Sequence, residues 1–263
     1  MIRLIATDMD GTLLTPANTL PEGLSEVLKA LKERGITFVV ASGRSITALE
    51  KNFRGVEGVT NLICDNGALT ILNDRLLSAA YVPRATICKV IDALKGLPDL
   101  AVMLCCKNGT YHEPYSQKYT ETTARYYVNQ VTVPDLKAVE EDCYKITVLD
   151  FRGGVERTQP LLREKLGEEL TLFVTGTYWT DIMDKGVNKG SALKVFQDKL
   201  GVSPEETMAF GDYYNDMPLF ERAAFSFAMA NAPEDMRKKA RFVAPSNAED
   251  GVLRTIRERV LAD

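Results

Sequence analysis

Short apolar runs alternate with amphipathic segments over the first quarter of the chain. The runs at 3–6, 36–41 and 61–64 are unbroken, which predicts buried strands. Between the first two runs, apolar residues recur at i, i+3, i+4 and i+7 and predict a helix over about 22–34. A second, short helix is predicted before the third run. Strand, helix, strand, helix, strand is the order of a parallel sheet with right-handed crossovers.

The pattern changes after the third strand. Paired alternating runs are separated by Asn73-Asp74 and by Asn108-Gly109, and each arrangement predicts a β-hairpin. A further strand is predicted at 143–151, and a last pair of strands over 171–183. Helices are predicted at about 85–95, 118–130 and 155–166. Hairpins mixed with helices are typical of an α+β domain rather than of a continued parallel sheet.

The α/β alternation returns near residue 185. A helix opens at Lys189-Gly190, a strand at 207–210 runs into GDYYND, and two short strands and a helix close the chain. We therefore predict an α/β protein with a discontinuous core domain formed by residues 1–83 and 185–263. Residues 84–184 form an α+β domain inserted into this core.

Composition narrows the class of protein. The chain is 45% hydrophobic and 26% charged, as in ordinary soluble proteins. Its 32 basic and 36 acidic residues give a net charge of -4, and no basic stripe with interleaved aromatics predicts nucleic-acid binding. No apolar run approaches the roughly 20 residues that span a bilayer. The N-terminus does not resemble a signal peptide, and five irregularly spaced cysteines indicate reduced thiols in the cytoplasm. The single histidine, His112, is expected at the surface.

Polar motifs follow four of the predicted strands. They are DMDGTLL, SGR, DNGA and GDYYND. Because ligands of open parallel sheets bind beyond the carboxyl ends of the strands, these motifs are expected to meet on one rim. Clustered carboxylates repel each other unless a cation neutralises them, and hard oxygen ligands suit Mg²⁺. Gly11-Thr12 and Ser42-Gly43 offer donors to a phosphate, and Lys189 adds a positive charge at a helix N-terminus. This combination predicts a phosphoryl-transfer site.

These motifs, in this order, resemble those of the haloacid dehalogenase superfamily. The match consists of D-x-D-G-T, Ser-Gly-Arg, a lysine that opens a later helix, and G-D-x-x-N-D. The insert between the Ser42 and Lys189 motifs is similar to that of the Cof-type branch. The resemblance covers essentially the whole chain, and it implies a Rossmann-like core with a mobile α/β cap.

The resemblance also implies a role for each matching residue. Asp8 corresponds to the nucleophile that forms an aspartyl-phosphate, and Asp10 to the general acid/base. Mg²⁺ would be bound by Asp8, the main-chain carbonyl of Asp10, Asp212 and, directly or through water, Asp216. Phosphoryl oxygens would be held by Ser42, Gly43, Lys189 and Asn215, with Asn66-Gly67 at the entrance. Two aspartates one residue apart would point to opposite faces of a strand, so the chain is expected to turn after Asp8, with Gly11 in the turn.

The expected activity is Mg²⁺-dependent hydrolysis of a small phosphate monoester, such as a sugar phosphate. Two alternatives remain open: a phosphomutase, since phosphomannomutases are similar in layout, and a non-catalytic phosphate-binding module. The expected partner is a small phosphorylated metabolite, and the expected assembly is a monomer or small homo-oligomer. The cap is expected to decide the substrate, and its aromatic and polar residues include Tyr111, Tyr178, Trp179, Thr180 and Asp181. Substrate contacts are first sought at Asp181 and Met183, shortly before the Lys189 helix, where the cap rejoins the core.

Overall fold

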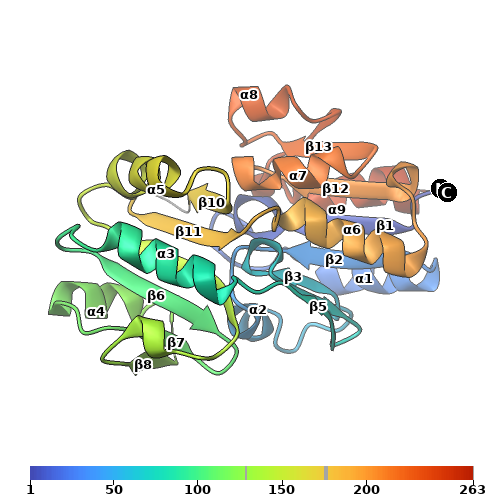
Figure 1. Cartoon of the computed structure of the whole chain (residues 1–263). Coiled ribbons are helices and arrows are strands. Elements are labelled where there is room, and N and C mark those ends of the chain that lie inside the picture. The colour runs from blue at the N-terminus through green and yellow to red at the C-terminus, as the bar shows by residue number, and fades with distance from the viewer. Residues whose placement is uncertain (128, 175–176, 263) are drawn as a thin grey trace. The chain divides into compact units, whose positions relative to one another are not determined.

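A computed structural model describes residues 1–127, 129–174 and 177–262. The chain divides into two compact units (Figure 1). The core unit combines Met1–Ala79 with Asn188–Asp263, and the inserted unit is Ala80–Val187. The sequence-based boundaries were drawn after residue 83 and before residue 185. Among the described residues, no helix combines the length and the apolar character needed to cross a membrane.

The core unit is built on an eight-stranded sheet with the order β14-β13-β12-β1-β2-β3-β4-β5. Neighbouring strands from β14 to β3 are parallel, and β4 and β5 continue the sheet antiparallel. This confirms the predicted α/β class with a Rossmann-like parallel sheet. The strands are β1 (Leu4–Asp8), β2 (Thr37–Ala41), β3 (Leu62–Cys64), β4 (Leu69–Leu72), β5 (Arg75–Ala79), β12 (Thr207–Gly211), β13 (Phe225–Met229) and β14 (Phe242–Ala244).

Helices cover this sheet, so its central strands are buried on both sides. All five residues of β1 are buried, as expected for a strand in the middle of a parallel sheet. Leu193 and Phe196 of α6 pack with Leu4 and Val39 in one large apolar cluster. The helices are α1 (Leu24–Glu33), α2 (Ile46–Asn52), α6 (Lys189–Leu200), α7 (Met217–Glu221), α8 (Glu234–Arg237) and α9 (Gly251–Ile256).

The inserted unit has a sheet of its own, with the order β10-β11-β9-β6-β7-β8. Apolar residues of α3 and α5, among them Ile87 and Leu162, pack with Leu104 and Ile146 of the sheet. The elements are α3 (Arg84–Leu94), β6 (Ala101–Cys106), β7 (Thr110–His112), α4 (Gln117–Thr123), β8 (Gln130–Thr132), β9 (Cys143–Leu149), α5 (Gln159–Leu166), β10 (Leu170–Val174) and β11 (Trp179–Asp184).

Two local expectations were wrong, and a third needs a refinement. The helix expected at 118–130 ends at Thr123, where Thr120, Thr122 and Thr123 in its last turn and the two tyrosines at 126–127 are weak helix formers. Gln130 instead begins a strand that pairs with β7. The helix expected at 155–166 is present: a π-helical segment at Gly154–Thr158 continues into α5 at Gln159, with Pro160 in the first turn of α5, where proline is tolerated. His112 is buried rather than exposed, because its ring packs 4.3 Å from the Tyr115 ring and Nδ1 bonds the Glu113 carbonyl.

Candidate active site

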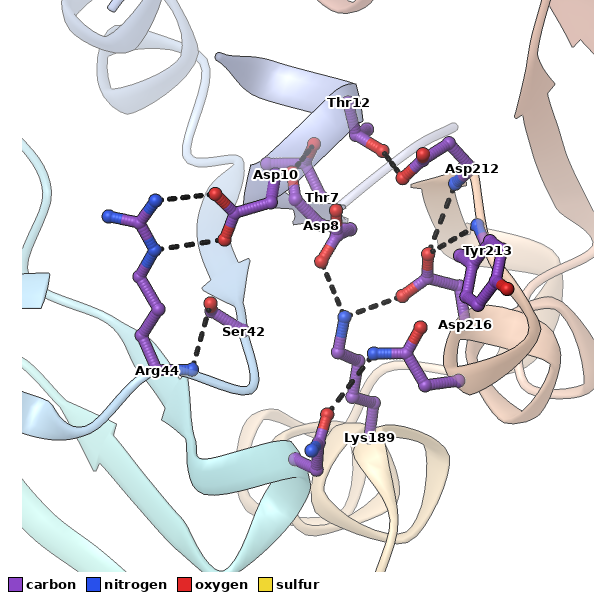
Figure 2. A network of polar contacts seen from close by, with 12 residues as sticks. Thr7, Asp8, Asp10, Thr12, Ser42, Arg44, Lys189, Asp212, Tyr213 and Asp216 are labelled. Atoms are coloured by element: carbon purple, nitrogen blue, oxygen red, sulfur yellow. Dashed lines mark hydrogen bonds and ion pairs between the residues drawn. The ribbon is translucent and has the colours of Figure 1, made fainter. Parts of the chain in front are cut away.

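The predicted rim exists at the carboxyl ends of β1, β2 and β12 (Figure 2). Asp8 is the last residue of β1, Ser42 follows β2, and Asp212 follows β12. Because β1 lies between β2 and β12 in register, the three strand ends are adjacent. Lys189, the first residue of α6, brings its side chain to the same point.

A tight turn over Met9–Leu13 begins directly after Asp8 and contains Asp10 and Gly11. Gly11 has φ +80°, a left-handed conformation that glycine adopts without steric cost. A Cβ at this position would lie 2.3 Å from Asp212 Oδ2, so the close approach of the two loops also requires glycine. The expected turn is thus present. The Asp8 carboxylate points toward Lys189, and the Asp10 carboxylate points to Arg44 (Figure 2).

Lys189 is fully buried and paired with two carboxylates. Its Nζ donates to Asp8 Oδ1 at 2.5 Å and to Asp216 Oδ1 at 2.6 Å. Burial by itself would lower the pKa of Lys189, but Asp216 and Asp8 raise the pKa above its ordinary value. The lysine is therefore a fixed positive charge. The helix that carries it starts with a capping box between Asn188 and Ser191, which fixes where the lysine emerges.

A third carboxylate, that of Asp212, lies close to the two that bind Lys189. Asp8, Asp212 and Asp216 each offer an oxygen within 4.8 Å of the others. Burial and the Asp216 carboxylate raise the pKa of Asp8 well above its ordinary value, although Lys189 opposes the shift. The same two causes raise the pKa of Asp212 to about 6, against a hydrogen bond from Thr12 Oγ1 at 2.9 Å. Both shifts therefore reflect burial first and the neighbouring Asp216 carboxylate second. An all-oxygen set with excess negative charge fits a hard divalent cation.

Asp216 differs from the other two acids because its oxygens already accept several hydrogen bonds. Oδ2 accepts from the backbone N–H groups of Asp212 and Tyr213 at 3.1 and 3.2 Å. Oδ1 accepts from Lys189. Asp216 therefore holds the Asp212 loop in place and orients the lysine. This arrangement favours a water-mediated contact with a metal over direct ligation.

The remaining predicted phosphate-binding residues lie beside the lysine. The Asn66 N–H donates to the Ser42 carbonyl at 2.9 Å, which fastens the DNGA turn to the loop after β2. Asn215 Nδ2 donates to Asn66 Oδ1 at 3.2 Å. A Cβ at Gly43 would lie 3.1 Å from the Asn66 amide, so glycine lets these loops approach closely. Ser42, Gly43, Asn66 and Asn215 are thus brought together.

Two of the contacts in this unit were not foreseen from the sequence. Thr12 bonds Asp212, and Arg44 binds Asp10 through two hydrogen bonds. Arg44 stands out in SGR as a charge directly after a buried strand, but its partner lies 34 residues away. No local pattern identifies such a partner.

The residues singled out in the inserted unit have mixed environments. Tyr111 is half-buried on β7, Tyr178 is exposed, and Trp179 is half-buried on β11. Thr180, Asp181 and Met183 are buried on β11.

Asp181 belongs to a buried polar network on this sheet. It accepts a hydrogen bond from Thr147 Oγ1 at 2.8 Å and lies 3.2 Å from Lys145 Nζ. Tyr127 donates to Thr147 at 3.3 Å. Lys145 and Tyr127 were missed, although a lysine within the apolar run CYKITVL is a visible signal.

The chain matches known proteins over nearly its full length. A model of haloacid dehalogenase-like hydrolases matches residues 5–256. The 5-amino-6-(5-phospho-D-ribitylamino)uracil phosphatase YbjI of Escherichia coli (strain K12) is 28% identical over 97% of this chain and 95% of its own. The HMP-PP phosphatase of Escherichia fergusonii is 29% identical over 90% of this chain and 87% of its own. The crystal structure of SMU.1108c from Streptococcus mutans UA159 superposes with a TM-score of 0.89, at 28% identity, over 100% of both chains.

Proposed function

The chain belongs to the haloacid dehalogenase-like hydrolases and is a phosphatase, and we propose that it hydrolyses small phosphate monoesters through an aspartyl-phosphate on Asp8. The observation that carries the proposal is the position of Asp8. It is a buried carboxylate at a strand end, bonded to a buried lysine and next to two further acids. A switch or a passive phosphate-binding module does not require Asp10 two residues further on.

In the first step, an oxygen of Asp8 attacks phosphorus and the bond from phosphorus to the leaving oxygen breaks. Asp10 donates a proton to that oxygen, so an alcohol leaves and Asp10 becomes a carboxylate. Lys189 and the Ser42 hydroxyl stabilise the charge that develops on the phosphoryl oxygens. Asn215 contacts the same group.

In the second step, Asp10 takes a proton from water while the water oxygen attacks the phosphorus of the aspartyl-phosphate. The bond between phosphorus and the Asp8 oxygen breaks. Inorganic phosphate leaves, the Asp8 carboxylate is regenerated, and Asp10 again carries a proton. One water is consumed per ester, and the protein returns to its starting state.

Mg²⁺ is the proposed cofactor. Asp8, the Asp10 main-chain carbonyl and Asp212 would hold it, with Asp216 behind a water, as the hydrogen bonds to Asp216 suggest. When bound, it supplies Lewis-acid stabilisation of phosphoryl charge and neutralises the acidic cluster. The raised pKa values of Asp8 and Asp212 support this assignment, since both carboxyls are buried beside the Asp216 carboxylate and a bound cation would favour their ionised forms.

We further propose that the inserted unit acts as a cap that selects the leaving group. The buried network of Lys145, Thr147 and Asp181 offers donors and acceptors for hydroxyl or ring-nitrogen groups. Both named relatives are phosphatases, and the Escherichia coli relative is named for a phosphorylated ribitylaminouracil. A small phosphorylated metabolite, such as a sugar phosphate or a related ester, is therefore the proposed substrate class.

The test is release of inorganic phosphate from a panel of sugar, nucleotide and cofactor phosphates, with Mg²⁺ or with EDTA. We expect metal-dependent release by the wild type and a loss of about 10⁴-fold or more in Asp8→Asn, on the scale for removal of a nucleophile. Isomerised ester with little free phosphate would identify a mutase instead. Activity that persists in Asp8→Asn would exclude the aspartyl-phosphate.

A further inference from the structure

Arg44 binds the carboxylate of Asp10 through both of its oxygens (Figure 2). Nε donates to Oδ2 at 2.9 Å and Nη2 donates to Oδ1 at 2.5 Å. This is the paired geometry in which a planar guanidinium fixes both the place and the plane of a carboxylate. Of the side chains in the described ranges, Arg44 alone hydrogen-bonds to the Asp10 carboxylate.

Arg44 is itself held from three directions. Its Nη1 donates to Asn52 Oδ1 at 2.9 Å, and Asn52 is the last residue of α2. Its backbone N–H donates to Ser42 Oγ at 3.1 Å, and its carbonyl accepts from the Asp65 N–H at 2.9 Å. The guanidinium therefore cannot follow Asp10 freely, and the carboxylate has to take the position that the arginine defines.

Stability does not explain this arrangement. The side chains of Arg44 and Asp10 are 32% and 49% exposed, and ion pairs this close to water contribute little to folding. The Asp10 carboxyl instead needs a partner that fixes its orientation. Asp10 lies in the turn after β1 and its side chain is half exposed, so without a partner its carboxyl would occupy several rotamers. Proton transfer requires the carboxyl within hydrogen-bond reach of the reacting oxygen, and a small misplacement slows such a step strongly.

We propose that Arg44, anchored by Asn52, is a positioning residue for the Asp10 carboxyl. Lys189 holds Asp8 and Arg44 holds Asp10, so two cations keep the two carboxylates of DMDGTLL apart and aimed in different directions (Figure 2). The inference rests on the proposed function, because it assigns Arg44 a task only if Asp10 transfers protons.

The experiment compares two esters whose leaving groups differ in their need for a proton. The nitrophenolate of p-nitrophenyl phosphate departs without receiving a proton. The alkoxide of an alkyl phosphate that the wild type accepts must be protonated as it leaves. For Arg44→Ala with the alkyl ester, we expect kcat to fall about 30- to 100-fold, within the range of acid–base catalysis, with KM changed less than about threefold. With p-nitrophenyl phosphate, the first step needs no proton, so the burst of nitrophenolate should persist. Hydrolysis of the aspartyl-phosphate still needs Asp10 as the base, so steady-state turnover should fall and the phosphoenzyme should accumulate, which acid quenching detects.

Three further variants sharpen the result. Asn52→Ala should reproduce the effect more weakly, and Arg44→Lys should recover part of the alkyl-ester rate, since lysine restores one charged donor but not the paired geometry. Arg54→Ala, on the exposed surface after the same helix, is the matched control and should behave as the wild type. Added guanidinium should raise the rate of Arg44→Ala but not that of Asp10→Asn.

Each contrary outcome is distinct. An active wild type with unchanged rates in Arg44→Ala would overturn the positioning role while leaving the proposed function intact. Equal losses of rate on both esters in Arg44→Ala, together with a lower melting temperature, would show that Arg44 has only a structural role. Faster turnover of the alkyl ester by this variant would show that Arg44 restrains Asp10 instead of positioning it. A wild type that releases no phosphate from either ester would overturn the proposed function, and this inference with it.

Discussion

Lys189 Nζ lies 2.5 Å from Asp8 Oδ1, across 181 residues of sequence and inside the protein. The lysine also bonds Asp216, so a single ammonium joins a residue at the end of β1 to the loop after β12. One buried charge therefore links the two chain segments that form the core unit. Removing it would leave Asp8 and Asp216 buried without their partner.

The first prediction concerns Lys189→Met. Loss of one partner of a buried pair costs about 3–5 kcal/mol, so the metal-free protein should be destabilised by that order and activity should be lost. Added Mg²⁺ should restore part of the stability by supplying positive charge. Chemical denaturation with EDTA or Mg²⁺ measures both effects.

Lys194→Met is the matched control, because Lys194 on the same helix pairs with Asp198 in solvent. Exposed pairs at i,i+4 contribute about 0.3–0.5 kcal/mol, so this variant should keep both stability and activity. Equal destabilisation by the two substitutions would contradict the importance given to Lys189.

The second prediction concerns Gly11. Gly11→Ala should cost about 1–2 kcal/mol for the left-handed backbone, and it should also weaken Mg²⁺ binding because the new Cβ displaces Asp212. Gly35→Ala is the control, since Gly35 has φ +69° with no atom within 4 Å of the added Cβ. It should show the backbone cost alone. Calorimetric Mg²⁺ titration of the two variants separates strain from displacement, and equal metal affinities would refute the proposed contact.

The third prediction concerns pH. Burial first, and Asp216 second, raise the pKa of Asp212 to about 6, so the folded metal-free protein binds a proton there more tightly than the unfolded chain does. Its contribution to stability is therefore present at low pH and is lost as pH rises through about 6. Mg²⁺ requires the ionised carboxylate, so its affinity should drop about tenfold for each pH unit below 6 if one proton is released.

Titration calorimetry between pH 5 and 7.5 measures this proton release directly, and thermal unfolding in EDTA follows the stability. Metal affinity that does not vary across this range would show that Asp212 is already ionised at pH 5. Asp212→Asn should remove the contribution of Asp212 to the pH dependence and most of the binding, and any pH dependence that remains is assigned to Asp8, whose pKa is also raised.

The fourth prediction concerns the inserted unit. Asp150 is fully buried and accepts two hydrogen bonds from Arg157, each at 2.8 Å, and one from Thr158 at 2.9 Å. Burial alone would raise the pKa of Asp150. The hydrogen bonds that Asp150 accepts, those from Arg157 above all, outweigh burial and lower the pKa below its ordinary value. Asp150→Asn should destabilise the unit by about 2–3 kcal/mol, somewhat below the range for fully buried pairs because Arg157 is partly exposed.

A lowered pKa gives stability that is present above the unfolded value of about 3.9 and is lost as pH falls below it. The wild-type unit should therefore weaken in acid more steeply than Asp150→Asn. Denaturation followed by the fluorescence of Trp179, the single tryptophan, reports on this unit. Asp92→Asn, which breaks an exposed pair with Lys137, serves as the control and should leave the midpoint nearly unchanged.

The order of elements and the rim of polar motifs could be predicted because they depend on local patterns. Apolar runs such as 36–41 specify buried strands, and parallel strands bring their carboxyl ends to one edge. Asp8, Ser42 and Asp212 follow from that rule together with the family resemblance. The turn at Gly11 follows from glycine itself, which takes a positive φ without penalty.

The contacts that set charge and orientation were decided by the tertiary structure. The partners of Lys189 and of Arg44, the burial of His112, and the pairing of Lys145 with Asp181 each join residues from different elements or depend on how rings pack. Periodicity records only which face of an element is apolar, and it carries no information about which charge on one element meets which charge on another. The sequence by itself thus determined which residues reach the rim. Only the packing of strands and loops decided which cation holds each carboxylate, because this pairing depends on distances of a few ångströms between distant parts of the chain.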